Sequence, residues 1–168
     1  MSIQTRRLLG TSLLLTSLMF GASQALAEVV LHRGNSGEPQ TLDRLPPAEA
    51  ELHSQAVLRA LVAAAKSDGH IDERERALIE GEFTRLDTDG ELQQWLHAEL
   101  NKPLDPAEVA RAAQTPEMAA EMYLASVMMV DQEHFMERAY LDELARQLRL
   151  DPALRQELEN QVRLGAGQ

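Results

Sequence analysis

Apolar residues recur at helical spacing along the chain from residue 46 onward. In the first such segment one apolar stripe is expected to face a core, with Arg59 and Lys66 on the outer side. That stripe consists of Leu58, Leu61, Val62 and Ala65. Pro and Gly separate further segments, and the pattern predicts helices near residues 47–67, 71–86, 89–101, 106–114, 116–130, 134–149 and 152–164. The expected fold is a single compact, all-α bundle of about seven helices.

Local signals mark the starts of several of these helices. Asp105, Thr115 and Asp151 each stand directly before a proline, which places an N-cap side chain ahead of a Pro at the first helical position. Thr88 and Glu91 have the spacing of a capping box. These signals predict the N-termini of four helices.

The segment 116–130 is apolar nearly all round, which is typical of a helix at the centre of a core. Its methionines, Met122, Met128 and Met129, would serve an adaptable binding groove or the core, and the pattern favours core packing.

A weak internal repeat relates two pairs of helices. Residues 61–68 and 124–131 are each an apolar stretch that ends at an aspartate, and each is followed by a Glu-Arg-Ala that begins at Glu75 or Glu137. Two such units are expected to pack around a pseudo-twofold axis. That packing would bring the two acidic turns near one another.

The first 45 residues do not fit the helical pattern. Arg6 and Arg7 precede an uncharged apolar run over 8–20 and then small residues that end at Ala27. These are the parts of a secretory signal peptide, so we expect residues 1–27 to be a signal, 28–45 an extended linker and 46–168 the helical domain. Cleavage after Ala27 would release the protein into the periplasm. If the segment is retained instead, it would anchor the protein in the inner membrane.

The segment 28–43, which contains a Gly-Glu-Pro-Gln-Thr-Leu-Asp turn, resembles the mature N-terminus of bacterial oligopeptide-binding proteins. The resemblance stops at residue 43, and the lobes that hold the peptide in that family have no counterpart in this chain. No peptide substrate is expected from it.

The amino-acid composition limits the classes of partner and of metal site that are expected. The 168 residues are 44% hydrophobic but only 4% aromatic, which suits one helical core. The formal charge is −11 without any run of Lys and Arg, so a nucleic-acid partner is not expected. Membrane association is expected only if the signal is retained. With no cysteine, disulfides and thiolate metal sites are excluded.

Catalytic motifs are missing from the sequence. The five histidines form no HExxH pattern, and neither GxSxG nor a P-loop occurs. The segment 87–90 echoes the end of a calcium loop, but the spacing favours a turn that joins two helices. We therefore expect that the protein is not an enzyme and has no catalytic residues.

One acidic turn is a candidate site for a divalent cation. Asp68 ends one predicted helix, and Asp72 and Glu75 lie three positions apart at the start of the next. Ca²⁺ and Mg²⁺ prefer such oxygen ligands, and Asp131 and Glu137 of the second turn would help to complete the shell. The alternative is that Asp72 and Glu75 form only a capping box at a helix start.

The run from Leu58 to Glu75 resembles the signature of the YebE-like family, domain of unknown function 533, within the tellurite-resistance TerB-like superfamily. Further matches over residues 48–164 include Trp95-Leu-His-Ala-Glu-Leu and the run that begins at Glu137. The resemblance implies a TerB-like helical fold. It also implies, in the better-known relatives, an Asp-Gly-x-Ile-Asp-x-x-Glu motif linked to divalent metals and stress responses, carried here by Asp68, Asp72 and Glu75. The front of the chain departs from the family, whose leader is usually Gly-rich and hydrophobic.

These observations favour a non-enzymatic binding or stress-related module of the cell envelope with protein partners and a divalent-cation site. Two alternatives stay open. One is an accessory hydrolase that uses paired carboxylates, and the other is a purely structural interaction domain.

Overall fold

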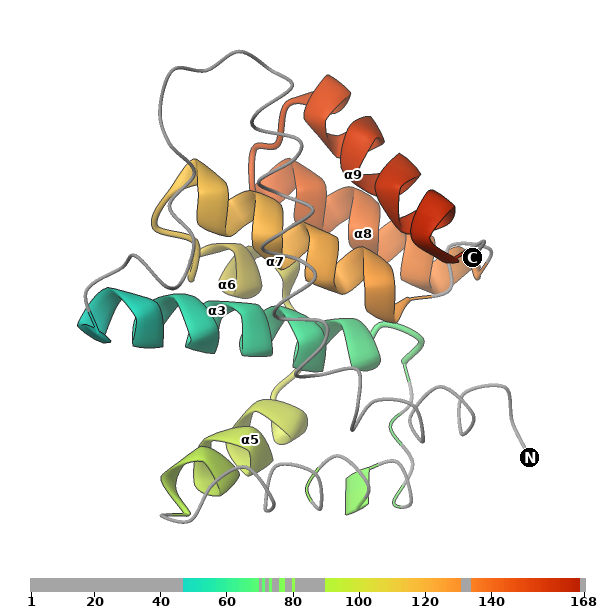
Figure 1. Cartoon of the computed structure of the whole chain (residues 1–168). Coiled ribbons are helices and arrows are strands. Elements are labelled where there is room, and N and C mark those ends of the chain that lie inside the picture. The colour runs from blue at the N-terminus through green and yellow to red at the C-terminus, as the bar shows by residue number, and fades with distance from the viewer. Residues whose placement is uncertain are drawn as a thin grey trace.

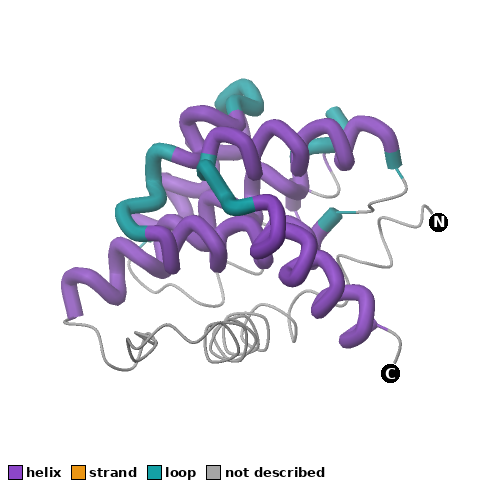
Figure 2. The backbone as a smooth tube through the Cα atoms, turned by 90° about the horizontal axis from the view of Figure 1, so that it is seen from above, coloured by secondary structure: helices purple, strands orange, loops and turns teal. Residues whose placement is uncertain are grey.

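The computed structural model describes residues 47–69, 71, 73, 76, 77, 80, 90–130 and 134–166. Every regular element in these ranges is a helix, as Figure 2 shows. The helices are α3 (Pro47–Ala65), α5 (Glu91–Asn101), α6 (Pro106–Ala110), α7 (Pro116–Met129), α8 (Phe135–Gln147) and α9 (Pro152–Ala166). The all-α prediction is confirmed.

Six of the seven predicted helices correspond to these elements. The seventh, predicted over 71–86, falls mostly outside the described residues, although residues 73, 76, 77 and 80 are helical. The predicted signal peptide (1–27) and linker (28–45) also lie outside them.

Three of the predicted N-caps are confirmed by hydrogen bonds. The Ala107 amide donates to Asp105 Oδ1 at 2.9 Å, and the Met118 amide donates to Thr115 Oγ1 at 3.1 Å. Asp151 Oδ2 accepts from the third residue after it, Leu154, at 3.2 Å. Each cap satisfies a backbone donor that the first helical turn leaves unpaired.

The predicted start of α5 is wrong by two residues. The helix begins at Glu91, and its N-cap is Gly90, which has φ +75° and makes no side-chain cap bond. Thr88 lies outside the described residues. Glycine takes this left-handed conformation without the clash that a Cβ would cause, so Gly90 occupies the N-cap position without strain.

The predicted end of α6 is also wrong, because the helix stops at Ala110 and not at 114. Thr115 has extended backbone angles, as it must to act as the N-cap of α7. The residues between turn tightly, and Ala112 and Ala113 donate to carbonyls three positions earlier. The extended backbone that Thr115 needs as the N-cap of α7 therefore prevents α6 from continuing to residue 114.

The centre of the fold is α7, as the apolar pattern predicted. Residues 118 to 127 are all buried, and Met122 and Tyr123 have no exposed surface. In Figure 1, α3 runs along one side of α7, α8 and α9 lie on other sides of it, and α5 lies beyond α3. Leu144 of α8 and Leu158 of α9 complete the core at 0% exposure.

The predicted stripe on α3 is too narrow. The helix is buried without a break from Ala60 to Ala64, while Leu58, Ala65 and Lys66 are half-buried. The physical reason is that α3 lies between two partners. Ala60 belongs to the cluster around α7, whereas Val62 packs with Leu96 of α5. A helix covered on two faces cannot keep one apolar stripe.

Within the described residues, no helix has the length and apolar character that crossing a membrane requires.

Candidate functional site

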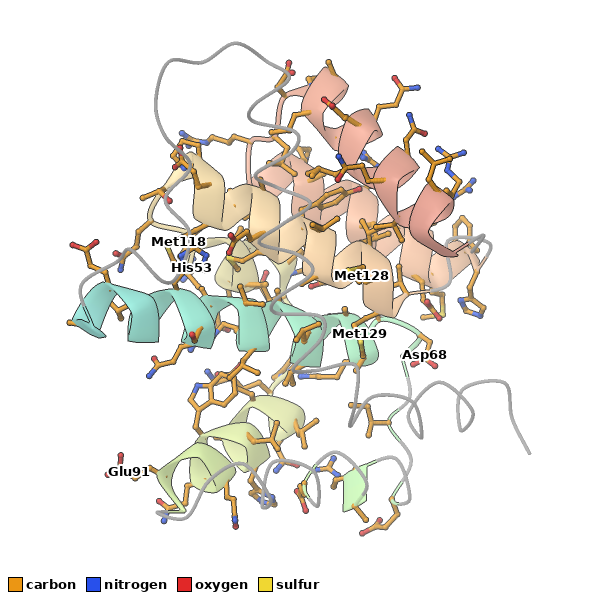
Figure 3. The ribbon with its side chains drawn as sticks, viewed as in Figure 1. His53, Asp68, Glu91, Met118, Met128 and Met129 are labelled. Carbon is orange, nitrogen blue, oxygen red and sulfur yellow. The ribbon has the colours of Figure 1, made fainter. Side chains whose placement is uncertain are left out.

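The turn that follows α3 is where the sequence placed the first candidate ligand. Ser67 and Gly69 donate backbone bonds to Ala64 and Lys66 at 3.1 and 3.0 Å, which closes the helix end in a tight turn. Gly69 has φ +85°, a conformation that favours glycine. Asp68 is half-buried just before this reversal, beyond the end of α3 (Figure 3).

The start of α8 packs against this turn. A Cβ added to Gly69 would stand 3.1 Å from the terminal methyl carbon of Met136, in the first turn of α8. The next residue, Glu137, is 4% exposed. Its carboxylate lies where the amide dipoles of the helix start favour negative charge. The repeat predicted that the two acidic turns lie near one another, and this contact brings α8 to the turn after α3.

Only part of the predicted cation site can be placed. Asp68 and Glu137 are described, while Asp72, Glu75 and Asp131 lie outside the described residues. Both described carboxylates already interact with other groups of the protein. Among the residues that the structure describes, no three His, Cys, Asp or Glu side chains are grouped as metal ligands would be. The five-residue site stays a prediction.

Large apolar side chains are exposed at the same corner. Phe135 is 83% exposed and Met136 is 48% exposed, both at the start of α8. Met128, near the end of α7, is 39% exposed (Figure 3). The prediction that the methionines of 116–130 pack in the core is therefore right for Met122 and wrong for Met128. Met128 lies in the last turn of α7, after the continuous buried stretch that ends at Val127.

A buried contact between a histidine and a glutamate joins α3 to α7, and the sequence analysis did not predict it. His53 Nε2 contacts Glu121 Oε2, and both residues are 3% exposed. The available signal was the carboxylate of Glu121 within the apolar stretch of the helix. Such a group needs a partner in the core, because a buried charge is costly when it is unpaired.

Lys66, expected on the outer side of α3, instead binds the C-terminal end of α5. Its Nζ donates to the carbonyl oxygen of Glu99 at 2.8 Å and also to that of Lys102. A cation there satisfies carbonyls that the helix end leaves unpaired. Burial lowers the pKa of the Lys66 ammonium, against the opposing effect of Glu99. Lys66 therefore ties α5 to α3.

The space around Lys66 is small. The cavity there has a volume of about 20 Å³, which is room for about one water molecule. The surrounding charges are paired with one another: Lys102 Nζ lies 2.7 Å from Glu99 Oε1 and 3.1 Å from Glu108 Oε1. This cluster is a structural clamp and not a ligand pocket.

A second polar cluster ties α9 to α7 and α8. The Tyr123 hydroxyl donates to Glu159 Oε1 at 2.6 Å, and Arg155 Nε donates to the same carboxylate oxygen at 2.8 Å. Arg155 also binds Asp142 of α8, and its guanidinium lies 5.8 Å from the centre of the Tyr123 ring. Burial, followed by the Glu159 bond, raises the pKa of Tyr123. The hydroxyl is thus a fixed donor.

Comparison with known proteins identifies the family. The family model described as "Protein of unknown function (DUF533)" matches residues 5–162, so the chain belongs to this family. The match begins at residue 5 and runs through the front of the chain, where we expected a departure from the family. A protein of Yersinia enterocolitica, described as "Uncharacterized protein in ampR 5'region", is 33% identical over 133 residues, which are 79% of this chain and 94% of that protein. No solved structure matches.

Proposed function

We propose that this member of the DUF533 family is a non-catalytic binding module of the cell envelope whose α3–α8 corner responds to a divalent cation. The α3–α8 corner is the turn 66–69 together with the first turn of α8. The family supplies no activity of its own to build on. The proposal therefore rests on the residues.

The observation that carries the proposal is the contact between Met136 and Gly69. Asp68 is the neighbour in sequence of one of these residues, and Glu137 is the neighbour of the other. The contact therefore supports a location of both acidic residues, one from each half of the repeat, at the same corner. The C-terminal end of α3 carries partial negative charge, which also favours a cation there.

The chemistry of the donors suits a hard cation. Ca²⁺ takes six to eight oxygen ligands and Mg²⁺ takes six, several of them water. Asp68 and Glu137 supply oxygens of this class but are too few to form a site. The proposal therefore also requires Asp72, Glu75 and Asp131, together with backbone carbonyls or water.

Two observations support a non-enzymatic role. The Ser67 hydroxyl, beside Asp68, donates to the Ala64 carbonyl at 2.6 Å, so it serves its own helix. His53 is buried against Glu121 and is only 3% exposed, which leaves little surface for contact with a substrate. Exposed Phe135, next to Met136, supports a protein partner that covers this corner.

Thermal unfolding with and without a cation tests the proposal. A cation that binds only the folded protein at 100 times its dissociation constant stabilises it by roughly 2.7 kcal/mol. We expect Ca²⁺, Mg²⁺ or Mn²⁺ at millimolar concentration to raise the melting temperature relative to a chelator. Identical melts for all three cations and the chelator would overturn the proposal.

Variants separate a specific site from general screening of an acidic protein. Asp68→Asn combined with Asp72→Asn should abolish the cation-induced shift, yet change the melt in chelator little, since Asn caps a helix about as well as Asp. The matched control is Asp87→Asn combined with Asp89→Asn, which removes the same charge from another acidic segment of the sequence. An equal loss of the shift in both double variants would mean screening alone.

The place of action is tested by fractionation. If the protein is exported and its signal removed after Ala27, the intact mass of the periplasmic form should correspond to a chain that begins at Glu28. A full-length chain in the membrane fraction would instead support the anchored alternative.

A further inference from the structure

Methionine provides all the sulfur chemistry of this chain, which has seven methionines and no cysteine. The described methionines differ in exposure, and Met129 is half-buried. Met118 is 6% exposed and Met122 is 0% exposed, whereas Met128 is 39% exposed and Met136 is 48% exposed. Oxidation of a thioether requires access to its sulfur. Met128 and Met136 are therefore the sites that an oxidant reaches first.

The two exposed methionines differ in what they touch. Met136 is the residue whose side chain meets the space beside Gly69, with its terminal methyl carbon 3.1 Å from the position of an added Cβ. Apart from Gly69 and its chain neighbours, no other described atom comes within 4 Å of that position. Met128 is also exposed, but none of its atoms lies within 4 Å of that position. Of the two exposed methionines among the described residues, Met136 is the one whose side chain lies at the turn after α3.

We propose that Met136 is an oxidation site, and that its reaction with a peroxide changes the conformation of the turn 66–69. In the reaction a lone pair of the Met136 sulfur attacks one oxygen of hydrogen peroxide and forms the S–O bond. The O–O bond breaks, and the second oxygen leaves as water after a proton shift. The thioether loses two electrons and becomes a sulfoxide, and the peroxide is reduced.

The sulfoxide changes the contact with Gly69. It is polar and bulkier than the thioether, so the side chain no longer suits an apolar contact at this distance. Gly69 has little freedom to adapt, since its φ of +85° and its bond to the Lys66 carbonyl define the turn. Oxidation of Met136 therefore loosens the turn that holds Asp68. Enzymatic reduction of the sulfoxide would restore the contact.

The experiment treats the folded full chain with hydrogen peroxide and follows two quantities. Peptide mass spectrometry gives the oxidation rate of each methionine, and hydrogen exchange gives the protection of the Ser67 and Gly69 amides. Met128→Leu and Met136→Leu are matched variants, because leucine keeps about the volume of methionine without the sulfur. Neither readout involves a cation, so the result is independent of the proposed function.

We expect Met136 and Met128 to oxidise at least about tenfold faster than Met122, which reacts only when the fold opens. Oxidation should reduce amide protection at the turn in the wild type and in Met128→Leu, but not in Met136→Leu. Oxidation of Met136 no faster than that of Met122 would overturn the proposal. Unchanged protection at Ser67 and Gly69 after Met136 is oxidised would also overturn it.

Discussion

Removal of the His53 ring tests whether the buried pair between α3 and α7 holds the core together. In His53→Ala the Glu121 carboxylate loses a partner while it stays in a site that is 3% exposed. A buried carboxylate that loses its partner costs more than the pair itself contributes, because its water shell is not restored.

The size of the effect follows from this burial. Loss of one partner of a buried pair costs about 3–5 kcal/mol, and we expect the lower value, about 3 kcal/mol, because Glu121 makes a further interaction within the protein. For a domain of this size that loss lowers the melting temperature by roughly 10 °C.

A double-mutant cycle isolates the charge. Glu121→Gln keeps the shape of the side chain but leaves an uncharged amide, which is less costly to bury than a carboxylate. His53→Ala should therefore destabilise the Glu121→Gln protein less than it destabilises the wild type. The cavity left by the ring is the same in both backgrounds and cancels. Urea unfolding of the four proteins measures the difference.

Two results would refute this reasoning. One is a cost of His53→Ala that is equal in both backgrounds, since the loss would then come from the cavity alone. The other is a cost below about 1 kcal/mol, which is the net contribution of a typical hydrogen bond within a protein.

Three further predictions concern the hydroxyls, the charges and the caps. Tyr123→Phe should cost about 1 kcal/mol, because it removes a bond at 2.6 Å, whereas Tyr140→Phe should be neutral or stabilising, because that buried hydroxyl has no partner in the described structure; urea unfolding checks the opposite signs. The bond from Arg146, followed by that from the next residue, lowers the pKa of Glu143 to about 2. Because the folded pKa is below the ordinary value, the stabilisation from the ionised Glu143 is present near neutral pH and is lost as the pH falls toward 2. NMR titration should show a higher pKa for Glu143 in Arg146→Ala than in the wild type, while the bond from Gln147 remains. Thr115→Ala should cost about 1 kcal/mol through the lost N-cap of α7, and no change in the thermal melt would contradict the cap.

The sequence predicted only part of the candidate site. The acidic turn was visible from the spacing of Asp68 and its followers, and the repeat suggested that a second turn lies near it. The contact that joins the two halves, Met136 against Gly69, carries no signal in either segment. An exposed methionine at a helix start looks the same whether or not a glycine from a distant turn lies beside it.

The sequence by itself determined the features that depend on neighbours within about one helical turn. The caps at Asp105 and Thr115 and the apolar surface of α7 are of this kind, because a side chain and the backbone donor it satisfies lie two or three residues apart. The helical class and most helix boundaries follow from them.

Only the tertiary structure decided which distant groups meet. His53 and Glu121 are 68 positions apart, and Lys66 reaches a carbonyl 33 positions away. Each of these polar groups is unfavourable in a core until its partner arrives, and the periodicity of one segment does not contain the position of another. The packing of α3 between α7 and α5 supplies both partners, and the same packing makes the buried face of α3 wider than its sequence predicts.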